Sequence, residues 1–86
     1  MKEYEKILKA LANRRRLQTI KYLKAEKQAT VTDIAEHLKL SFKSTSKHLA
    51  VLFSAGIVDK EQISLSMFYS IVESLPKPAK QVIDLI

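Results

Sequence analysis

A stretch of lysines and hydroxyl residues near the middle of the chain is the clearest candidate for chemistry. The segment "SFKSTSKHL" places Lys43, Ser46 and Lys47 three and four residues apart, which puts them on one face of a helix. A serine hydroxyl can donate or accept at a base edge, and a lysine can reach a base acceptor or a phosphate. This face suits a nucleic acid. The alternative is a solvated surface helix, on which Ser and Lys are ordinary residues.

The charge of the chain favours the same kind of partner. The formal net charge is +6, from 15 basic and 9 acidic side chains, and residues 1–27 hold nine Lys/Arg against three Asp/Glu. A basic half suits a polyanion, while the alternative is a solvated lysine-rich surface. We expect some of four residues, Arg14, Arg15, Arg16 and Lys21, to flank a groove and to meet phosphates rather than bases.

Residues for other chemistry are scarce. The chain has no cysteine, which excludes disulfides and thiolate metal sites. Asp33 and His37 are four apart and could share a cation, but an ordinary surface pair is favoured. No Ser/His/Asp set, buried carboxylate pair or phosphate-binding glycine loop can be assembled. We expect no enzyme activity, no cofactor and no metal.

The sequence also indicates where the protein works. No apolar run approaches the roughly 20 residues that span a bilayer. The N-terminal "MKEYEKILKA" is charged and lacks the apolar core of a signal peptide. We expect a cytoplasmic protein with no membrane partner.

Apolar residues at helical spacing predict four helices in the first two thirds of the chain. Asn13 and Ser41 are the expected N-caps of the second and fourth helices, and Thr30 or Thr32 caps the third. The polar "EKQATVT" is expected to be a linker, with Val31 in a short extended piece. The predicted helices cover residues 2–12, 14–25, the segment from the Thr30 or Thr32 cap through Leu38, and Phe42 to Ser54.

The pattern changes after Gly56, the expected left-handed end of the fourth helix. "IVDKEQI" and "MFYSIV" are β-branched and aromatic, and "SLS" separates them, so residues 57–72 should form a hairpin. The alternating Ile63, Leu65 and Met67 should share one side of it. Pro76 and Pro78 then bracket the start of a last helix over residues 77–86, with Pro78 tolerated in its first turn.

This order of elements defines a fold class. We expect a mainly α protein with a small β-hairpin, a winged helix-turn-helix in the order α-α-α-α-β-β-α. Residues 1–86 should form a single domain, with the helix-turn-helix at about 32–54. In this fold the second helix of the motif lies in the DNA major groove.

Two stretches of the sequence resemble a known family, the ArsR-type transcriptional repressors of bacteria and archaea. "LKALANRRRLQTIKYL" is similar to the opening signature, with its Arg16-Leu17 pair, and "VTDIAEHLKLSFKSTSKHLAVLFSAGIV" is similar to the motif core. The resemblance covers about residues 5–72, and Tyr69 matches the aromatic of the second wing strand. The residues at characteristic positions are Ser46, His48, Leu49, Leu52, Ala55, Gly56 and Val58.

The resemblance implies a sequence-specific, double-stranded DNA-binding transcriptional regulator that acts as a repressor. It assigns base reading to Phe42, Lys43, Ser46 and Lys47, with Ser44 between them. Phe42 stands where the family commonly has a polar residue. It should either contact a thymine methyl or pack back into the fold, and packing back is favoured.

The family's sensing sites do not carry over. Its thiolate box falls on "ATVTDIAEH", which has no cysteine, and its C-terminal site needs Asp and His where this chain offers only Asp84. His48, at its family position, is expected to be a structural hydrogen-bonding residue. Arg16, also at a family position, could brace the fold as well as meet a phosphate. The regulator should therefore lack the family's metal sites.

The resemblance further implies a homodimer that pairs through the first and last helices. The chain also ends on the apolar "VIDLI", which a partner subunit would bury or which marks a cut. The alternative function is a protein–protein interaction module that uses the apolar wing tip "QISLSM" or the last helix. The expected dimer-interface residues are Tyr4, Ile7, Leu8, Leu11, Val82, Ile83 and Ile86.

Overall fold

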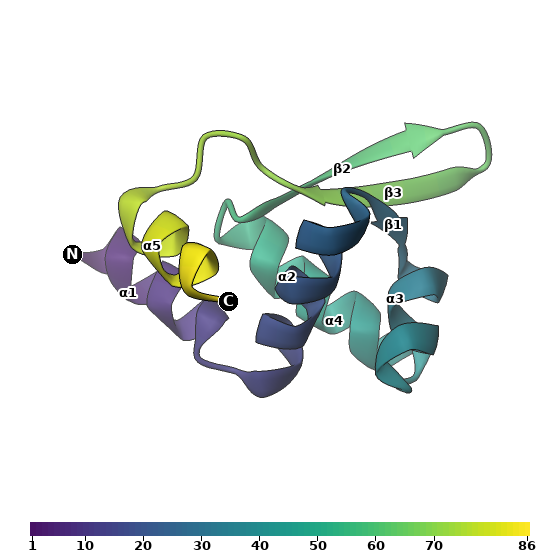
Figure 1. The fold of residues 1–86 in the computed structure, drawn as a ribbon, viewed down its shortest axis with the longest axis horizontal. Helices are drawn as coiled ribbons and strands as arrows, with labels where there is room; N and C mark the ends of the chain where they lie inside the picture. The colour runs from purple at the N-terminus through teal and green to yellow at the C-terminus, as the bar shows by residue number, and fades with distance from the viewer.

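The computed structural model describes all residues 1–86 and contains five helices and three strands (Figure 1). The winged helix-turn-helix order predicted from the sequence is confirmed, with one additional short strand before the third helix. The elements are α1 (Lys2–Leu11), α2 (Arg14–Glu26), β1 (Ala29–Thr30), α3 (Val31–Leu38), α4 (Phe42–Ser54), β2 (Val58–Ile63), β3 (Ser66–Ile71) and α5 (Lys77–Leu85).

The predicted N-caps of α2 and α4 are confirmed. The Asn13 side chain accepts the Arg16 N–H at 3.0 Å, and the Ser41 hydroxyl accepts the Ser44 N–H at 3.0 Å. Each bond satisfies one of the amides that a helix N-terminus leaves without a partner. These local bonds fix where the two helices begin.

The cap of α3 is Thr30 rather than Thr32. Thr30 accepts the Asp33 N–H at 3.1 Å while Asp33 accepts the Thr30 N–H at 3.1 Å, which is a capping box. Val31 is consequently the first residue of the helix. The prediction that Val31 lies in a short extended piece was wrong. The extended residues are Ala29 and Thr30, just before it.

Left-handed residues end both helices of the helix-turn-helix. Gly56 has φ +75°, and the amides of Gly56 and Ile57 donate to the carbonyls of Phe53 and Leu52 at 3.0 Å each. This is the Schellman arrangement, and Gly adopts it without a Cβ penalty. Lys39 takes the equivalent place after α3 with φ +58°.

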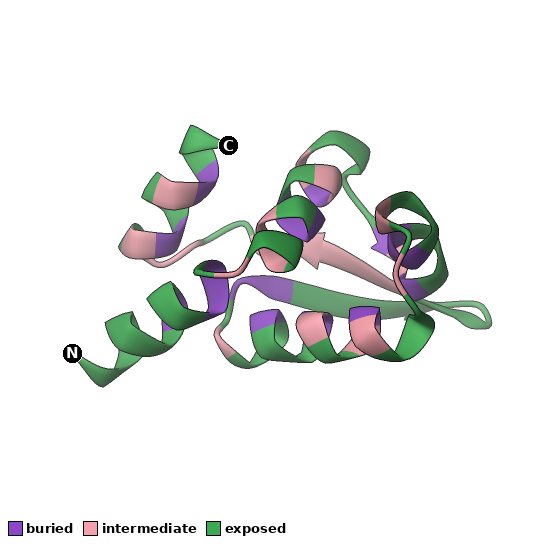
Figure 2. Ribbon diagram, turned by 90° about the horizontal axis from the view of Figure 1, so that it is seen from below, coloured by how far each residue is buried: buried purple, intermediate pink, exposed green.

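The strands form one antiparallel sheet in the order β1-β3-β2. β1 was not predicted; it pairs Ala29 with Tyr69 on β3. The hairpin of β2 and β3 extends beyond the helices, with its turn at the far end from α1 and α5 (Figure 1). Its tip is exposed (Figure 2).

The register of this hairpin corrects one expectation. Ile63 pairs with Ser66, and Gln62 pairs with Met67. Cross-strand partners share a face and neighbours along a strand alternate, so Ile63 and Met67 lie on opposite faces. The prediction that they share a side with Leu65 was wrong, because the turn between Ile63 and Ser66 interrupts the alternation that holds only within a strand.

All five helices and the sheet contribute to one hydrophobic core. α2 lies at the centre, with α1 and α5 side by side at one end and α3, α4 and the hairpin at the other (Figure 1). None of the helices is both long enough and apolar enough to cross a membrane. The fully buried large side chains include Ile20, Leu23, Ile34, Leu49, Leu52, Ile57 and Val58.

Candidate nucleic-acid interface

Helix α4 has an inner and an outer side, as the sequence predicts. Thr45 and Leu49 are buried, and the Thr45 hydroxyl donates to the Ser41 carbonyl at 2.9 Å, so no polar group is stranded in the core. Lys43 and Lys47 are exposed and Ser46 is half-buried. The outer side thus presents two cations and a hydroxyl to solvent within two helical turns.

Phe42, at the first turn of α4, does not pack back into the fold. Its side chain is 61% exposed, so the favoured expectation was wrong. The ring instead lines a hollow of about 500 Å³ together with Leu65 and Met67 of the wing. Phe42 therefore lies between α4 and the wing.

Several cations flank the helix-turn-helix. Arg14 and Arg15 are exposed at the start of α2. Arg15 lines a second hollow with Lys21 on the next turns of α2 and Lys39 in the turn before α4. Lys39 was not predicted as a site residue. The available signal was its position in the turn between the two motif helices.

Arg16 is half-buried, and its guanidinium contacts both α1 and α4. Its Nε donates to the Ala10 carbonyl at 2.6 Å, and its Nη2 donates to the Lys9 carbonyl at 3.1 Å. Its Nη1 lies 3.3 Å from Nδ1 of His48 on α4. All three guanidinium nitrogens thus contact other residues of the protein, which favours a role in bracing the fold over the expected phosphate contact.

His48 fits the structural role expected of it. Partial burial of the ring lowers the pKa of His48, and the positive charges of Arg16 and Arg15 lower it further. The ring is therefore neutral near neutral pH, and Nδ1 can accept from the Arg16 guanidinium.

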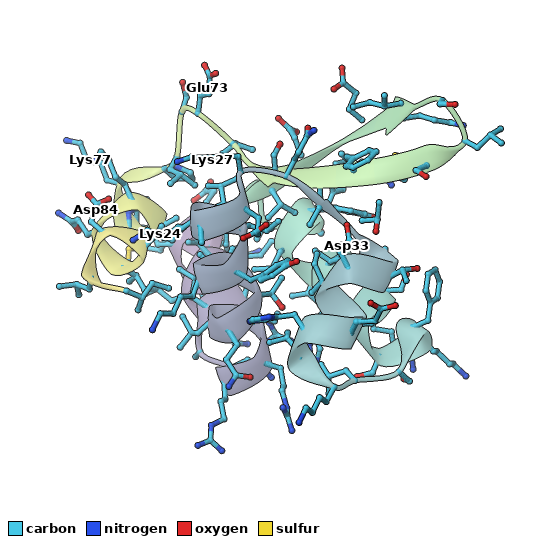
Figure 3. The ribbon with its side chains drawn as sticks, turned by 45° about the vertical axis from the view of Figure 1, so that its right-hand side comes forward. Lys24, Lys27, Asp33, Glu73, Lys77 and Asp84 are labelled. Carbon is cyan, nitrogen blue, oxygen red and sulfur yellow. The ribbon has the colours of Figure 1, made fainter.

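The Asp33 and His37 pair is occupied by other contacts. The Asp33 carboxylate belongs to the α3 capping box, at the start of that helix (Figure 3). The His37 ring stacks on Tyr22 of α2 with centroids 4.3 Å apart. No group of three His, Cys, Asp or Glu side chains is placed to hold a metal ion.

The wing differs from α4 in its chemistry. Asp59 and Glu61 are exposed on β2, and Lys60 lies with its Nζ 4.6 Å from the centre of the Phe53 ring. The turn ends on Leu65, which is 96% exposed. The wing tip thus presents an apolar side chain and no cation.

Exposed apolar residues also lie on α1 and α5, two helices that pack against each other. Ile7, Leu11 and Ile83 are only 5%, 3% and 3% exposed, so the protomer's own core already buries them. This corrects their expected assignment, because they have almost no surface left for a second copy. Tyr4, Leu8 and Ile86 are exposed, Val82 is half-buried, and Leu85 joins them.

The fold and this site define a winged helix-turn-helix protein in which the outer side of α4 is cationic. The family model described as "Bacterial regulatory protein, arsR family" matches residues 13–60. The chain belongs to this family. The family's description is that of bacterial regulatory proteins.

Relatives agree in fold and class. The transcriptional activator HlyU of Vibrio cholerae is 35% identical over 65 residues, a match that covers 76% of this chain and 59% of the relative. This chain thus spans less than two thirds of that relative's length.

Solved structures show the same architecture. HlyU of Vibrio cholerae matches with a TM-score of 0.81 at 31% identity, covering 96% of this chain and 86% of that one. The transcriptional repressor PagR of Bacillus anthracis matches with a TM-score of 0.82 at 28% identity, and the match covers 98% of this chain and 92% of that one. A homodimeric winged helix-turn-helix DNA-binding domain from Mycobacterium bovis matches with a TM-score of 0.83 at 27% identity. The match covers 98% of this chain and 74% of that one.

Proposed function

We propose that the protein is a sequence-specific regulator that binds double-stranded DNA in the cytoplasm by placing α4 in the major groove. The observation that carries this proposal is the outer side of α4, where Lys43, Ser46 and Lys47 are accessible while Leu49 anchors the opposite side. Short polar groups suit base edges and cations suit either bases or phosphates.

The other cations position the protein on the duplex. These cations lie beside α4, which we call the reading helix, and not on it. They are Arg14, Arg15 and Lys21 on α2 and Lys39 in the turn before α4. Phosphate contacts of this kind fix register and supply affinity that depends on salt but not on sequence.

The regulator acts as a symmetric homodimer. Tyr4 and Leu8 are 51% and 50% exposed on α1, and Val82, Leu85 and Ile86 carry the apolar surface along α5. α1 and α5 pack side by side, so these residues belong to one end of the molecule (Figure 1). The Mycobacterium bovis relative is a homodimer. A two-fold dimer would read two half-sites about one helical turn apart.

The mode of regulation is repression without the family's metal sites. The chain has no cysteine, and Asp33 and His37 are held by other contacts. Among the relatives, HlyU is an activator and PagR a repressor, so the same fold serves both directions. We propose repression because a dimer lying across a promoter blocks access to it.

The test begins with selecting an operator from random duplexes and measuring its affinity against a random duplex across a salt series. Lys43→Ala and Ser46→Ala should weaken operator binding more than random binding, by ~1–3 kcal/mol for a good base contact. Arg14→Ala with Arg15→Ala should weaken both and lower the salt slope by roughly one unit for each phosphate that is no longer neutralised.

The matched control is Lys77→Ala, which removes an exposed lysine of α5 at the far end from α4 (Figure 3). This variant should bind both duplexes like the parent. If Lys43→Ala and Ser46→Ala also bind both like the parent, α4 does not read DNA.

A second candidate function is supported by the wing. Leu65 is almost fully exposed and lines one hollow with Phe42 and Met67, a surface that suits an apolar group of a protein partner. Under this proposal Leu65→Ser would abolish binding of that partner and leave DNA affinity unchanged. A loss of DNA affinity in Leu65→Ser would count against it.

A further inference from the structure

Cations of α2 cap the C-terminal ends of both helices that form the proposed dimer surface. Lys24 donates to the Ile83 carbonyl of α5 at 2.8 Å, and it lies beside that helix in Figure 3. Arg16 donates to the Lys9 and Ala10 carbonyls at the end of α1. Carbonyls at a helix C-terminus lack helical partners and attract positive charge.

Only one of these two cations also reaches the reading helix. Arg16 lies 3.3 Å from Nδ1 of His48, and His48 is two residues after Ser46 on α4. A guanidinium is planar and its donors point in fixed directions. Through its three nitrogens, Arg16 links the end of α1 to the middle of α4.

The same contacts leave Arg16 less exposed than its two neighbours in the sequence. Arg14 and Arg15 are exposed, whereas Arg16 is half-buried against α1 and α4. The neutral His48 ring, with its lowered pKa, is a suitable acceptor for the guanidinium. Neighbouring arginines in one sequence run therefore have different environments.

We infer that Arg16 is a positioning residue for operator binding, which holds α4 through His48 in a fixed orientation to α1 and contacts no phosphate itself. The inference rests on the proposed function. If two copies pair through α1, the orientation of α4 relative to α1 sets how the two reading helices are spaced. Loss of Arg16 should then affect an operator with two half-sites more than random DNA.

The test compares Arg16→Gln and Arg16→Lys with the parent, on the selected operator and a random duplex, across a salt series. Each variant is measured below its own unfolding transition. Both should lose about tenfold in operator affinity, within the range for residues of one hydrogen-bonding network, with an unchanged salt slope. A lysine is no rescue, because one ammonium cannot hold two carbonyls and a ring nitrogen in the same geometry.

A phosphate contact would behave differently. Arg16→Gln would then lower the salt slope by roughly one unit, and Arg16→Lys would retain the parent's slope and most of its affinity. Arg14→Gln supplies the reference for this behaviour, because Arg14 is an exposed arginine of the same run.

Two further variants separate positioning from general support of the fold. His48→Ala should resemble Arg16→Gln, and the double variant should lose no more than either single one, because both remove the same link. Lys24→Ala removes the matching cap of α5 without touching α4, so it should keep the parent's ratio of operator to random affinity.

Each outcome decides the inference. A slope lowered by one unit in Arg16→Gln, rescue by lysine, or parent-like operator binding in His48→Ala overturns it while the proposed function stands. If Arg16→Gln does not fold, Arg16→Lys and His48→Ala still decide it. A parent that binds neither duplex overturns the proposed function and this inference together.

Discussion

The reading helix and the wing are the two parts of this fold that would lie nearest to DNA, and they differ in chemistry. α4 presents Lys43 and Lys47 around Ser46, with no acidic residue on the helix. The wing carries Asp59 and Glu61 on β2 and ends on an exposed leucine. Within one winged helix-turn-helix fold, α4 can therefore have the chemistry of a DNA-binding surface while the wing lacks it.

The difference assigns the phosphate contacts to other elements. Carboxylates near a phosphate backbone are repelled, and Lys60 is the single cation of β2 and β3 and lies over the Phe53 ring. The cations around the helix-turn-helix, Arg15, Lys21 and Lys39, line a hollow on the other side of the motif. We infer that affinity comes from α2 and the turn, and discrimination from α4.

Reversing one charge in each region should give the largest contrast. Lys47→Glu places a carboxylate on the reading face, where like-charge opposition costs several kcal/mol, or more than about a hundredfold in affinity. Lys60→Glu on the wing should change affinity far less. Equal losses in the two variants, measured by titration with the selected operator, would remove the contrast.

Adding a cation to the wing tip should have a moderate effect. Leu65→Lys should strengthen binding to operator and random DNA alike, by about threefold to tenfold, and steepen the salt slope by roughly one unit as a new phosphate contact forms. Leu65→Gln is the uncharged control. Weaker binding in both variants would show that the leucine itself contacts the DNA.

Gly56, which lies between α4 and β2, should tolerate substitution at a small cost in the free energy of unfolding. Gly56 has φ +75°, and an added Cβ would meet nothing within 4 Å. Gly56→Ala should therefore cost about 1 kcal/mol of unfolding free energy from backbone strain alone. Denaturant unfolding measures the cost, with Ala55→Gly as a flexible neighbour. A loss several times larger would mean that the backbone between α4 and β2 must change its conformation to accommodate the alanine.

The smallest effect should be a pH dependence that belongs to α4, since the wing contains no histidine. The pKa of His48 is lowered in the folded state by burial and by Arg16 and Arg15, so the unfolded chain takes up a proton first. Stability should therefore fall as the pH drops below the ordinary histidine pKa of 6.5, and level off below the folded-state pKa.

Urea unfolding of the parent and His48→Gln at about pH 7.5 and about pH 5 measures this. The parent should lose more stability than the variant on acidification. The effect should be small because the ring is only partly buried. Parallel losses in the two proteins would contradict the assignment.

Local signals made much of this fold predictable. Asn13, Ser41 and Gly56 fix helix ends through bonds to residues within one turn, and each was identified from the sequence. β1 was missed because it is two residues long and depends on pairing with Tyr69 far along the chain. The opposite faces of Ile63 and Met67 depend on the length of the turn between them.

The candidate site was predictable where it lies on one helix. The accessible face of α4 followed from the spacing of its lysines. The sequence did not decide the role of Arg16, because its partners, Lys9, Ala10 and His48, come from two other helices. Exposure of Phe42 depended on the position of the wing, which periodicity does not give.

The most direct test of the division between α4 and the wing is one competition experiment. The experiment measures how well unlabelled random duplex competes with labelled operator for each of three proteins. These are the parent, the α4 variant Lys43→Ala/Ser46→Ala and the wing variant Leu65→Ser/Met67→Ser. We predict that the α4 variant loses most of the operator preference, while the wing variant keeps that of the parent. A wing variant that loses its preference while the α4 variant keeps it would contradict the claim that α4 reads the sequence.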